Sequence, residues 1–588
     1  MNKFENKKRI IIIGGVAAGT SAATKARRKS ETADIVIYEK YRYISYGTCG
    51  LPYFISDRIT DIESLIINKV EHFEKRFNVK VNILHEVIRI DPDDKSILVR
   101  NLTTDEEFKD YYDKLIISTG SDPLVINPEL YDATNTFSLK TIDDAVKLKD
   151  YINYLSEKDY STLEIKDNSR DYSNNKNPVN AVIVGGGFIG LELLDSFLAK
   201  GFKVTIIEKL NQLLPVFDFE IVEYLENYLK DKGVSILKED EIKDFEKDGR
   251  KYSIKNSSKK ITAVNTLKGN KLPVDILFLS IGARPQVALA KEAGLAIGDS
   301  GAISVNEYMQ TSNPDIYAAG DCCEVKDFIT GINIKYNLAN IASRQGRCVG
   351  YNAAGGKDKF TGGNPTSIIK VLDITIAKTG VSFREAKRLG YDAVKIELHY
   401  YDHAGYYPGA NMIHIFLIYD KKSGRILGFE AVGKTGVDKK LDVLSAAIKC
   451  RLKVWDLANI DFGYHPEYGS AKDSINILGM IGENIKKGEV GFISAEELRE
   501  KLSKKYNLIL LDIRSRGEYK AEHIEGSFNI PIDVLRENLG SLNKDSEIIV
   551  YCHTSYRSYL ALRILKNSGF KNVKNLNGSY LSWNRVLN

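Results

Sequence analysis

The sequence predicts an α/β protein of three or four domains, with two doubly wound nucleotide-binding units first and a smaller α/β unit last. Its 588 residues are more than one hydrophobic core accommodates. Two apolar runs, Ile10–Ile13 and Ala181–Val184, each lead into a Gly-rich turn and a helical pattern, the rhythm of parallel sheets covered by helices. Alternating strand and helix patterns return in 489–588, after a mixed stretch that lacks a nucleotide fingerprint.

The composition is that of an ordinary globular protein. Hydrophobic residues make up 43% of the chain, and 83 Lys and Arg are scattered among 78 Asp and Glu, for a net charge of +5. Neither a nucleic-acid partner nor a membrane surface is expected from so small a charge. No run approaches the ~18 apolar residues of a membrane helix, and six cysteines in so long a chain are not a disulfide framework. We therefore expect a cytoplasmic protein with reduced cysteines.

The first Gly-rich turn, Gly14–Gly19, is expected to meet a dinucleotide pyrophosphate with backbone N–H groups and a helix N-terminus. Val16 replaces the middle glycine of the G-x-G-x-x-G pattern, so the turn alone is a weak match. Glu39 supports it, because a carboxylate at the end of the next apolar run can accept hydrogen bonds from a ribose. The candidate binding residues are Gly14, Gly15, Ala18, Gly19, Glu39 and Lys40.

The second turn, Gly185–Gly190, satisfies the full fingerprint. Glu208 ends the following strand, where it accepts from a free 2′-OH and repels a 2′-phosphate, which favours NADH over NADPH. Neighbouring Lys203 and Lys209 weaken this preference, so NADPH stays the alternative. The candidate residues are Gly185, Gly187, Ile189, Gly190 and Glu208.

Three further segments resemble landmarks of the pyridine nucleotide-disulfide oxidoreductases: Ser118–Gly120, Gly282–Pro285 and Thr311–Asp321. The resemblance implies that the first unit binds FAD, with Asp321 on the ribityl chain, and that the second binds the nicotinamide donor. It adds Thr119, Gly120, Gly282, Gly320 and Asp321 to the candidate cofactor residues. The expected domains are an FAD-binding domain at 1–145 and 276–334, an NAD(P)H-binding domain at 146–275, a dimerisation domain at 335–472 and a linker at 473–488. The polar stretch Ser156–Pro178 is interpreted as a surface insertion.

Cys49 is the only cysteine before Cys322, so the CxxxxC pair of the glutathione-reductase branch is missing. A single thiolate beside a flavin can form a charge-transfer pair, a sulfenic acid or a mixed disulfide; the alternative is a small buried hydrophobe. The stretch Ser45–Tyr53 resembles the single-cysteine subgroup, which contains coenzyme A disulfide reductases, NADH oxidases and NADH peroxidases. Peroxidases carry His where this chain has Ala17, so the coenzyme A version fits better.

The resemblance also implies substrate contacts and a homodimer. Arg28 would meet a phosphate of coenzyme A, Ser45 and Thr48 would line the pantetheine channel, and Lys75 or Arg76 would add positive charge. Each basic residue could equally belong to a solvated helix face. Tyr406 and Tyr464 match tyrosines that the partner subunit places near the active cysteine, where their hydroxyl groups could act as general acids. Tyr46 departs from the family, which more often has Phe there.

The segment 489–588 resembles the rhodanese fold. Its landmarks are Leu511–Arg514, Glu518–Tyr519 and His523–Pro531, followed by the strand Ile548–Tyr551 and then Cys552 and Arg557. A Cys that opens a strand-to-helix loop lies among backbone N–H groups that favour a thiolate and hold a persulfide, and Arg557 is expected to stabilise that anion. The Cys-x₄-Arg spacing fits sulfur, whereas related phosphatases use Cys-x₅-Arg. Ser555 stands where the family usually has Gly; a degenerate docking domain is the alternative.

Together these features resemble the coenzyme A disulfide reductase–rhodanese fusions, also described as NADH-dependent persulfide reductases. The expected activity is reduction of coenzyme A persulfide, polysulfide or coenzyme A disulfide by NAD(P)H through FAD and Cys49, with Cys552 handling sulfane sulfur. No metal is expected. An NADH oxidase that works through a Cys49 sulfenic acid is one alternative, and a redox-sensing or sulfur-carrier protein is another. The sequence leaves open whether coenzyme A is a substrate or a bound thiol.

Overall fold

The computed structural model describes residues 7–157, 178–248 and 259–585. They form two compact units: Met1–Leu213 with Gly233–Gly363, and Leu214–Lys232 with Asn364–Asn588. Most of the expected polar insertion, 158–177, lies outside the described residues. Among the described residues, no helix has both the length and the apolar character needed to span a membrane.

The first nucleotide-binding sheet is parallel and has the strand order β18-β7-β1-β2-β3. The isoleucines of β1 form its centre, since Ile10, Ile11 and Ile12 are fully buried. The strands are β1 (Arg9–Ile13), β2 (Asp34–Glu39), β3 (Lys80–Ile83), β7 (Lys114–Ile117) and β18 (Ile316–Ala318).

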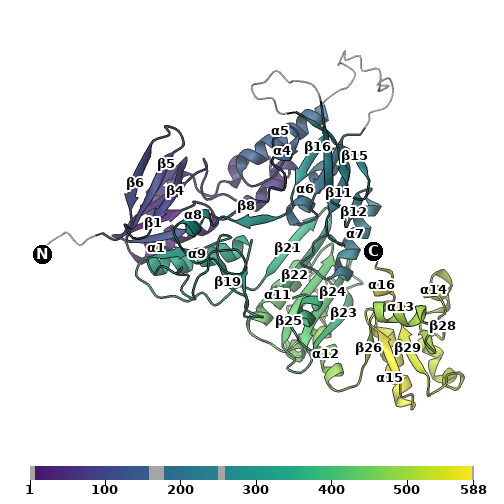
Figure 1. Ribbon diagram of the computed structural model, residues 1–588. Coiled ribbons are helices and arrows are strands. Elements are labelled where there is room, and N and C mark those ends of the chain that lie inside the picture. Colours follow the sequence, from purple (N-terminus) through teal and green to yellow (C-terminus); the bar gives the residue numbers. More distant parts are fainter. Residues whose placement is uncertain (1–6, 158–177, 249–258, 586–588) are drawn as a thin grey trace, which may run out of the picture. The chain divides into compact units, whose positions relative to one another are not determined.

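Helix α1 (Ala17–Lys29) follows β1 and packs on α9 (Ala339–Ala353) (Figure 1). Glycines allow the close approach: a Cβ at Gly346 would lie 2.2 Å from the carbonyl oxygen of Ala18, and one at Gly350 would lie 2.1 Å from that of Ala22. Helix α9 therefore belongs with the first sheet, and the unit ends at Gly363. The predicted start of the dimerisation domain at residue 335 is too early.

The second nucleotide-binding sheet is also parallel, with the order β12-β11-β10-β16-β9. Its strands are β9 (Thr136–Phe137), β10 (Asn180–Val184), β11 (Lys203–Glu208), β12 (Ser235–Lys238) and β16 (Ile276–Leu279). Strands β9 and β16 fall outside the predicted range 146–275, which needs correction at both ends. Strand β16 belongs to this sheet because it pairs in parallel with β10, from Ala181↔Ile276 to Val184↔Leu279.

Shorter elements complete the first unit. Strands β8 (Ser121–Pro123) and β17 (Ala283–Pro285) pair antiparallel. The first directly follows the landmark segment Ser118–Gly120, and the second lies within the landmark segment Gly282–Pro285. Each nucleotide-binding sheet is accompanied by a small antiparallel one: β4 (His85–Asp91), β5 (Ser96–Asn101) and β6 (Glu107–Tyr111); and β13 (Ile242–Lys247), β14 (Ile261–Thr266) and β15 (Lys271–Pro273). The remaining helices and strands are α2 (Leu51–Ile55), α3 (Val70–Phe77), α4 (Pro128–Tyr131), α5 (Ile142–Glu157), α6 (Phe188–Ala199), α8 (Ala288–Glu292), β19 (Glu324–Lys326) and β20 (Asn333–Lys335).

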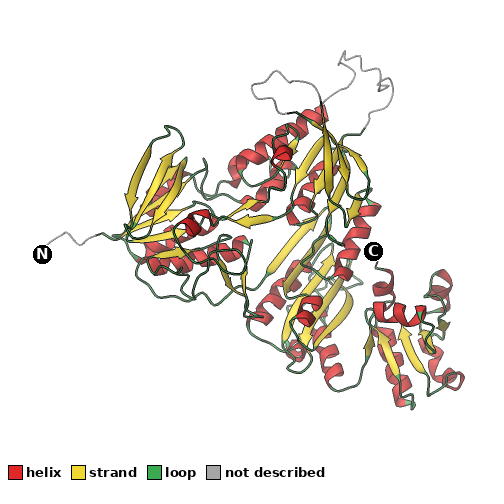
Figure 2. Ribbon diagram, in the orientation of Figure 1, coloured by secondary structure: helices red, strands yellow, loops and turns green. Residues whose placement is uncertain are grey.

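The second unit begins with α7 (Phe219–Asp231) and contains a five-stranded antiparallel sheet of order β21-β22-β25-β24-β23 (Figure 2). All eight residues of β25 are buried. The sheet consists of β21 (Thr366–Val371), β22 (Ile374–Gly380), β23 (Ala393–Tyr401), β24 (Met412–Asp420) and β25 (Ile426–Gly433), with α10 (Phe383–Arg388) and α11 (Val437–Lys449) beside it.

The predicted linker 473–488 is a helix, α12 (Ser474–Lys486), rather than a loop. Asp473 caps it, and its glycines pack against a neighbouring turn: a Cβ at Gly479 would lie 2.2 Å from the backbone nitrogen of Ala458, and one at Gly482 would lie 2.5 Å from Val454. Gly479 and Gly482 therefore serve tight helix packing.

The C-terminal sheet is parallel, with the order β26-β30-β29-β27-β28. Helices lie on both of its faces (Figure 2). Its strands are β26 (Phe492–Ile493), β27 (Leu508–Asp512), β28 (Phe528–Asn529), β29 (Glu547–Tyr551) and β30 (Val573–Leu576); its helices are α13 (Ala495–Ser503), α14 (Arg516–Ala521), the 3₁₀ segment η5 (Ile532–Ser541), α15 (Tyr556–Asn567) and α16 (Ser579–Asn584).

Candidate active sites

The first Gly-rich turn has the geometry of a dinucleotide cradle. Gly14 has φ +100, and a Cβ at Gly19 would lie 1.8 Å from the carbonyl oxygen of Gly14, so both positions require glycine. The buried Glu39 carboxylate accepts the backbone N–H of Gly15 at 2.7 Å and that of Tyr41 at 2.9 Å. Burial raises the pKa of Glu39, although these two hydrogen bonds and nearby lysines lower it.

The second turn repeats this arrangement. The Glu208 carboxylate accepts the backbone N–H of Gly186 at 2.7 Å and that of Leu210 at 2.8 Å. A Cβ at Gly190 would lie 2.5 Å from the carbonyl oxygen of Gly185, whereas a Cβ at Gly187 would meet no atom within 4 Å. The open space at Gly187 fits the close backbone approach that a pyrophosphate needs.

Two side chains bear on the choice of nicotinamide donor. Lys209 forms an ion pair with Glu241 at 3.1 Å, so its charge is partly committed within the chain. Ile189, in the first turn of α6, is 44% exposed, as a residue that covers a cofactor would be.

The remaining flavin candidates lie at the ends of neighbouring strands of the first sheet and beside the β8–β17 pair. Thr119 donates its hydroxyl to the carbonyl of Gln286 at 2.9 Å, and Gln286 N–H donates to the carbonyl of Gly120 at 2.9 Å. Ser121 donates to Asp321 at 3.1 Å, and burial raises the pKa of Asp321. Two further candidates, Gly282 and Gly320, have positive φ, and Ala18 packs against Gly320. The last candidate, Lys40, is half-buried.

The Cys49 loop is attached directly to the first Gly-rich turn. Ser45 N–H donates to the carbonyl of Gly15 at 2.9 Å, and the buried Ser45 hydroxyl accepts from Asn68 at 3.0 Å. Thr48 opens the 3₁₀ turn η1 (Thr48–Gly50) that carries Cys49 into α2. The loop therefore holds Cys49 next to the turn expected to bind FAD.

Cys49 is an exposed, free thiol. Protein atoms nevertheless crowd it on one side, so that partial burial raises the pKa of the Cys49 thiol; a hydrogen bond with Thr48 lowers it, and the charge of Glu192 raises it further. An accessible cysteine is not the small buried hydrophobe that the sequence left as an alternative.

Glu192 is a residue that the sequence did not single out. It lies on α6, two residues after Gly190, and Tyr53 O–H donates to its carboxylate at 3.5 Å. Burial raises the pKa of Glu192 to about 7, so this carboxyl group changes charge near neutral pH. The available signal was a lone carboxylate in the otherwise apolar first turns of Phe188–Ala199.

The expected phosphate-binding residues lie on two neighbouring helix ends. The buried Arg27 donates to the carbonyl oxygens of Phe77 and Asn78, and so ties the C-terminal end of α1 to that of α3. Arg28 is exposed at the end of α1, and Lys75 and Arg76 are exposed in the last turn of α3. The three side chains therefore stand on adjacent ends, where basic charge suits an anionic ligand.

Tyr406 and Tyr464 come together in the second unit. Their hydroxyl groups lie 3.0 Å apart, although 58 positions separate them in the chain, and their side chains are 76% and 52% exposed. The hydrogen bond to Tyr464 raises the pKa of Tyr406. Two tyrosines selected separately by resemblance thus form one exposed hydroxyl pair.

Cys552 lies at the end of β29, with only 1% of the residue exposed. Its backbone N–H donates to the hydroxyl of Ser579 at 3.2 Å, and the hydroxyl of Ser558 lies 3.4 Å from its Sγ. Ser555 caps α15 with φ +81, a left-handed conformation that glycine adopts without strain. The family's preference for Gly at this position therefore has a steric reason.

Arg557 binds Glu518 in this structure. Its two terminal nitrogens donate to the carboxylate at 2.6 and 2.8 Å, and Arg557 holds the pKa of Glu518 down to about 2. The guanidinium that the sequence predicts to stabilise the Cys552 anion thus also binds a carboxylate.

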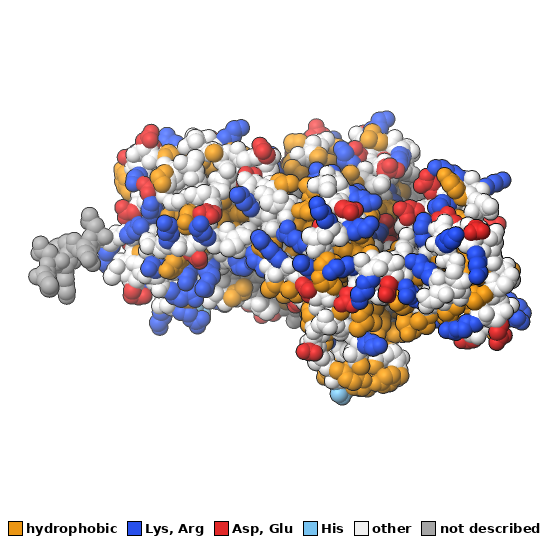
Figure 3. Space-filling view, turned by 90° about the horizontal axis from the view of Figure 1, so that it is seen from below, with side chains coloured by type: hydrophobic (Ala, Val, Ile, Leu, Met, Phe, Trp, Pro, Cys, Tyr) orange, Lys and Arg blue, Asp and Glu red, His pale blue; other side chains and the backbone are white. Residues whose placement is uncertain are grey.

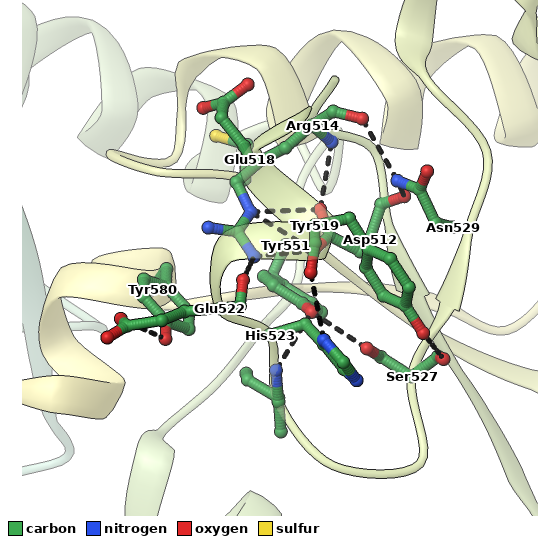
Figure 4. A network of polar contacts seen from close by, with 12 residues as sticks. Asp512, Arg514, Glu518, Tyr519, Glu522, His523, Ser527, Asn529, Tyr551 and Tyr580 are labelled. Atoms are coloured by element: carbon green, nitrogen blue, oxygen red, sulfur yellow. Dashed lines mark hydrogen bonds and ion pairs between the residues drawn. The ribbon is translucent and has the colours of Figure 1, made fainter. Parts of the chain in front are cut away.

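The other rhodanese landmarks form a polar network beside this loop (Figure 4). The buried pair Asp512 and Arg514 makes contacts of 2.7 to 3.1 Å, and Arg514 also donates to the carbonyl of Glu522 at 2.7 Å. Asn529 donates to the carbonyl oxygens of Asp512 and Arg514. The network fixes the ends of β27 and β28 next to β29, and so supports the loop that presents Cys552.

Acidic and basic side chains are intermingled over the face drawn in Figure 3, with apolar side chains between them. This distribution agrees with the small net charge of +5. Recognition of an anion must therefore come from local basic groups rather than from the charge of the whole chain.

Comparison with known families agrees with this division of the chain. Residues 8–346 match the pyridine nucleotide-disulphide oxidoreductase family, residues 366–474 match its dimerisation domain, and residues 494–585 match the rhodanese-like domain. The fold class predicted from the sequence is confirmed.

Two characterised relatives span the reductase part. Coenzyme A disulfide reductase of Staphylococcus haemolyticus is 30% identical, over 80% of this chain and 98% of the relative. An NADH oxidase of Methanocaldococcus jannaschii is 32% identical, over 80% of this chain and 97% of the relative.

Two solved structures extend over the C-terminal domain as well. Reduced Bacillus anthracis CoADR-RHD has a TM-score of 0.89 and 36% identity, covering 99% of this chain and 98% of that one. An NAD-dependent persulfide reductase from A. fulgidus has a TM-score of 0.85 and 33% identity, covering 98% and 100%. With the family matched over more than half of its length, this chain is an oxidoreductase that belongs to the pyridine nucleotide-disulphide oxidoreductase family and carries a rhodanese-like domain.

Proposed function

We propose that this enzyme uses NADH to reduce coenzyme A persulfide, polysulfide or coenzyme A disulfide at Cys49, and that Cys552 receives or delivers sulfane sulfur. The observation that carries the proposal is the presence of two different sulfur sites in one chain. One is an accessible lone thiol beside a dinucleotide turn, and the other is a thiol ringed by serine hydroxyls in a Cys-x₄-Arg loop. The relatives named for coenzyme A disulfide and persulfide reduction support it.

The chain's own residues fit the cofactors that this reaction needs. The Gly14–Gly19 turn, Glu39 and Asp321 would hold FAD, and the Gly185–Gly190 turn with Glu208 would hold NADH. When bound, FAD supplies the two-electron connection between NADH and Cys49.

Cys49 carries the sulfur chemistry. Its thiolate attacks the inner sulfur of coenzyme A persulfide, a Cys49–coenzyme A disulfide forms, and the outer sulfur leaves as hydrosulfide with one proton. Two electrons and a proton then cleave that disulfide into the Cys49 thiolate and free coenzyme A. Because neighbouring groups raise the pKa of Cys49, removal of its proton is a required step.

Tyr406 and Tyr464 suit the proton transfers. We place the enzyme in the cytoplasm as a homodimer in which these hydroxyls, from the partner subunit, serve the departing sulfur as general acids. Arg28, Lys75 and Arg76 would bind phosphates of coenzyme A, and Ser45 and Thr48 would line the path of its pantetheine arm.

Anaerobic NADH oxidation tests the proposal. Under argon, polysulfide with coenzyme A should be reduced to sulfide with one NADH consumed per sulfane sulfur. Cys49→Ser should lower the rate by at least about a thousandfold, as loss of a nucleophile does, while Cys450→Ser, at another exposed cysteine, should leave it unchanged. Full activity in Cys49→Ser would refute the proposal.

Oxidase activity is the second candidate, because one relative is named an NADH oxidase. In that reaction Cys49 would pass through a sulfenic acid on exposure to oxygen or peroxide. NADH oxidation in air without any sulfur compound, at a rate equal to that under argon with polysulfide, would favour it. If NADH oxidation stays slower than about one turnover per second with every acceptor, a redox-sensing or sulfur-carrier protein would instead be favoured.

A further inference from the structure

A groove of about 1140 Å³ lies in the rhodanese-like domain. Its walls come from α15, from η5 and from the turn that precedes α14. The groove starts at Arg557, two positions into α15, and ends near Ser568. Ile513, another lining residue, donates its N–H to the carbonyl of Tyr551, the residue before Cys552, at 3.1 Å, so this end of the groove lies beside the start of the sulfur loop.

The charge of this groove is strongly one-sided. Its described wall contains Arg516, Arg536, Arg557 and Arg563, against the single carboxylate of Asp533. Arg557 is partly neutralised by Glu518, and Arg563 donates one hydrogen bond to the carbonyl of Glu489 at 3.1 Å.

Two of the four arginines are uncommitted. Arg516 and Arg536 are exposed and have no ion-pair or hydrogen-bond partner for their side chains among the described residues. An uncommitted guanidinium offers its planar set of donors to phosphate or carboxylate oxygens.

The floor between the arginines is apolar. Ile532, Leu539, Leu560 and Ile564 line it, and Leu560 is 37% exposed. An amphipathic ligand, with anionic groups and a less polar arm, matches this pattern better than a small inorganic anion. The volume, about 1140 Å³, is slightly above the roughly 300–1,000 Å³ usual for small-molecule pockets, as a ligand as long as a nucleotide with a flexible arm requires.

We propose that this groove binds the nucleotide end of coenzyme A, so that the thiol at the other end of the same molecule meets Cys552. The inference rests on the proposed function for the identity of the thiol carrier, and it adds a second coenzyme A site, on the rhodanese-like domain itself. Arg516 and Arg536 hold phosphate groups, and the apolar floor carries the pantetheine arm towards Arg557 and the Cys552 loop.

The reaction at this site balances without an external reductant. The coenzyme A thiolate attacks the outer sulfur of the Cys552 persulfide. A sulfur–sulfur bond of coenzyme A persulfide forms, the sulfur–sulfur bond at Cys552 breaks, and its electron pair stays on Cys552 Sγ as thiolate. The reverse reaction loads Cys552 from coenzyme A persulfide.

The test measures discharge of the Cys552 persulfide in the full chain carrying Cys49→Ser. Polysulfide loads Cys552 chemically, and mass spectrometry of the Cys552 peptide follows its loss after addition of coenzyme A, 3′-dephospho-coenzyme A or pantetheine. We expect coenzyme A to discharge it about tenfold faster than pantetheine at low salt, as charge-assisted contacts to phosphate predict. The advantage should shrink as salt screens the charges.

Charge reversal assigns the effect to the groove. Arg516→Glu with Arg536→Glu should remove most of the advantage of coenzyme A and leave the pantetheine rate unchanged, whereas Lys571→Glu, on an exposed lysine of the same domain, should keep it. Equal discharge by coenzyme A and pantetheine in the parent chain, or an unchanged advantage in the double variant, would overturn the proposal. No NADH is used, so a failure of the Cys49 reductase proposal does not affect this readout.

Discussion

The hydroxyl of Ser558 lies 3.4 Å from the Sγ of Cys552, one turn into the helix that follows the sulfur loop. Ser558 is fully buried, and its hydroxyl is also 3.2 Å from that of Ser579. A cysteine anion or persulfide formed here is therefore solvated by serine hydroxyl groups in place of water. Hydrogen bonding to the charged form of a group favours that form.

Replacing Ser558 tests this solvation. Ser558→Ala should slow persulfide formation at Cys552 about three- to tenfold, because loss of one hydrogen bond near a charge costs about 1 kcal/mol or somewhat more. The rate of loading by polysulfide, followed by mass spectrometry of the Cys552 peptide, measures it. Ser503→Ala, on an exposed helix end, is the control. Equal loading rates in both variants would show that the hydroxyl has no part in stabilising the sulfur.

Ser555 should tolerate only residues that accept its left-handed backbone. With φ +81, Ser555→Gly relieves strain but loses two hydrogen bonds of 3.3 Å, to Leu576 and Ser579, so local stability should change by less than about 1 kcal/mol. Ser555→Val should cost about 2 kcal/mol, since a β-branched residue is strained there. Amide hydrogen exchange in α15 measures both. A Val variant as protected as the parent would contradict the strain argument.

Much of the fold could be predicted because its signals are local in the chain. Each Gly-rich turn and the glutamate that accepts its N–H are about 20 residues apart, a separation set by one strand and one helix. The Cys552 loop likewise lies within a few residues of Arg557 and Ser558. The pairing of Tyr406 with Tyr464 was different, because only family resemblance connected two residues so far apart in sequence.

The features that could not be predicted depend on contacts distant in sequence. Helix α9 joins the first unit because Gly346 and Gly350 fit against α1, more than 300 positions earlier. Strand β16 was assigned to the other sheet because its pairing with β10 leaves no mark in its own composition. Glu192 was overlooked because one carboxylate on a helix usually indicates a solvent-facing position; here the side chain is turned towards Tyr53.

Alanine substitutions at two glycines of the second turn should have different effects, one on NADH binding and the other on folding. Gly187→Ala adds a Cβ that meets no protein atom within 4 Å, so the protein should fold normally while the KM for NADH rises about tenfold or more through a clash with the pyrophosphate. Gly190→Ala instead places a Cβ 2.5 Å from the carbonyl of Gly185 and should destabilise the turn itself.

Steady-state kinetics together with thermal unfolding separates these outcomes. Gly540→Ala, which also meets no neighbour within 4 Å, is the matched control for a harmless methyl group. An unchanged KM for NADH in Gly187→Ala would exclude this turn as the nicotinamide dinucleotide site.

Glu192 should control the reactivity of Cys49 in a pH-dependent way. Burial raises the pKa of Glu192 to about 7, so its carboxyl group is mostly neutral at pH 6 and mostly charged at pH 8. The charged form raises the pKa of Cys49, and so reduces the fraction of thiolate only above pH 7.

Glu192→Gln removes that charge. Alkylation of Cys49 by iodoacetamide should therefore be roughly two- to tenfold faster in Glu192→Gln than in the parent at pH 8, and the two rates should converge at pH 6. Glu71→Gln, on the exposed side of α3, should match the parent at both values. An equal rate difference at pH 6 and pH 8 would contradict this prediction. At pH 6 the Glu192 carboxyl group is mostly neutral, like the amide that replaces it, so a difference there would come from altered packing around Cys49 and not from charge.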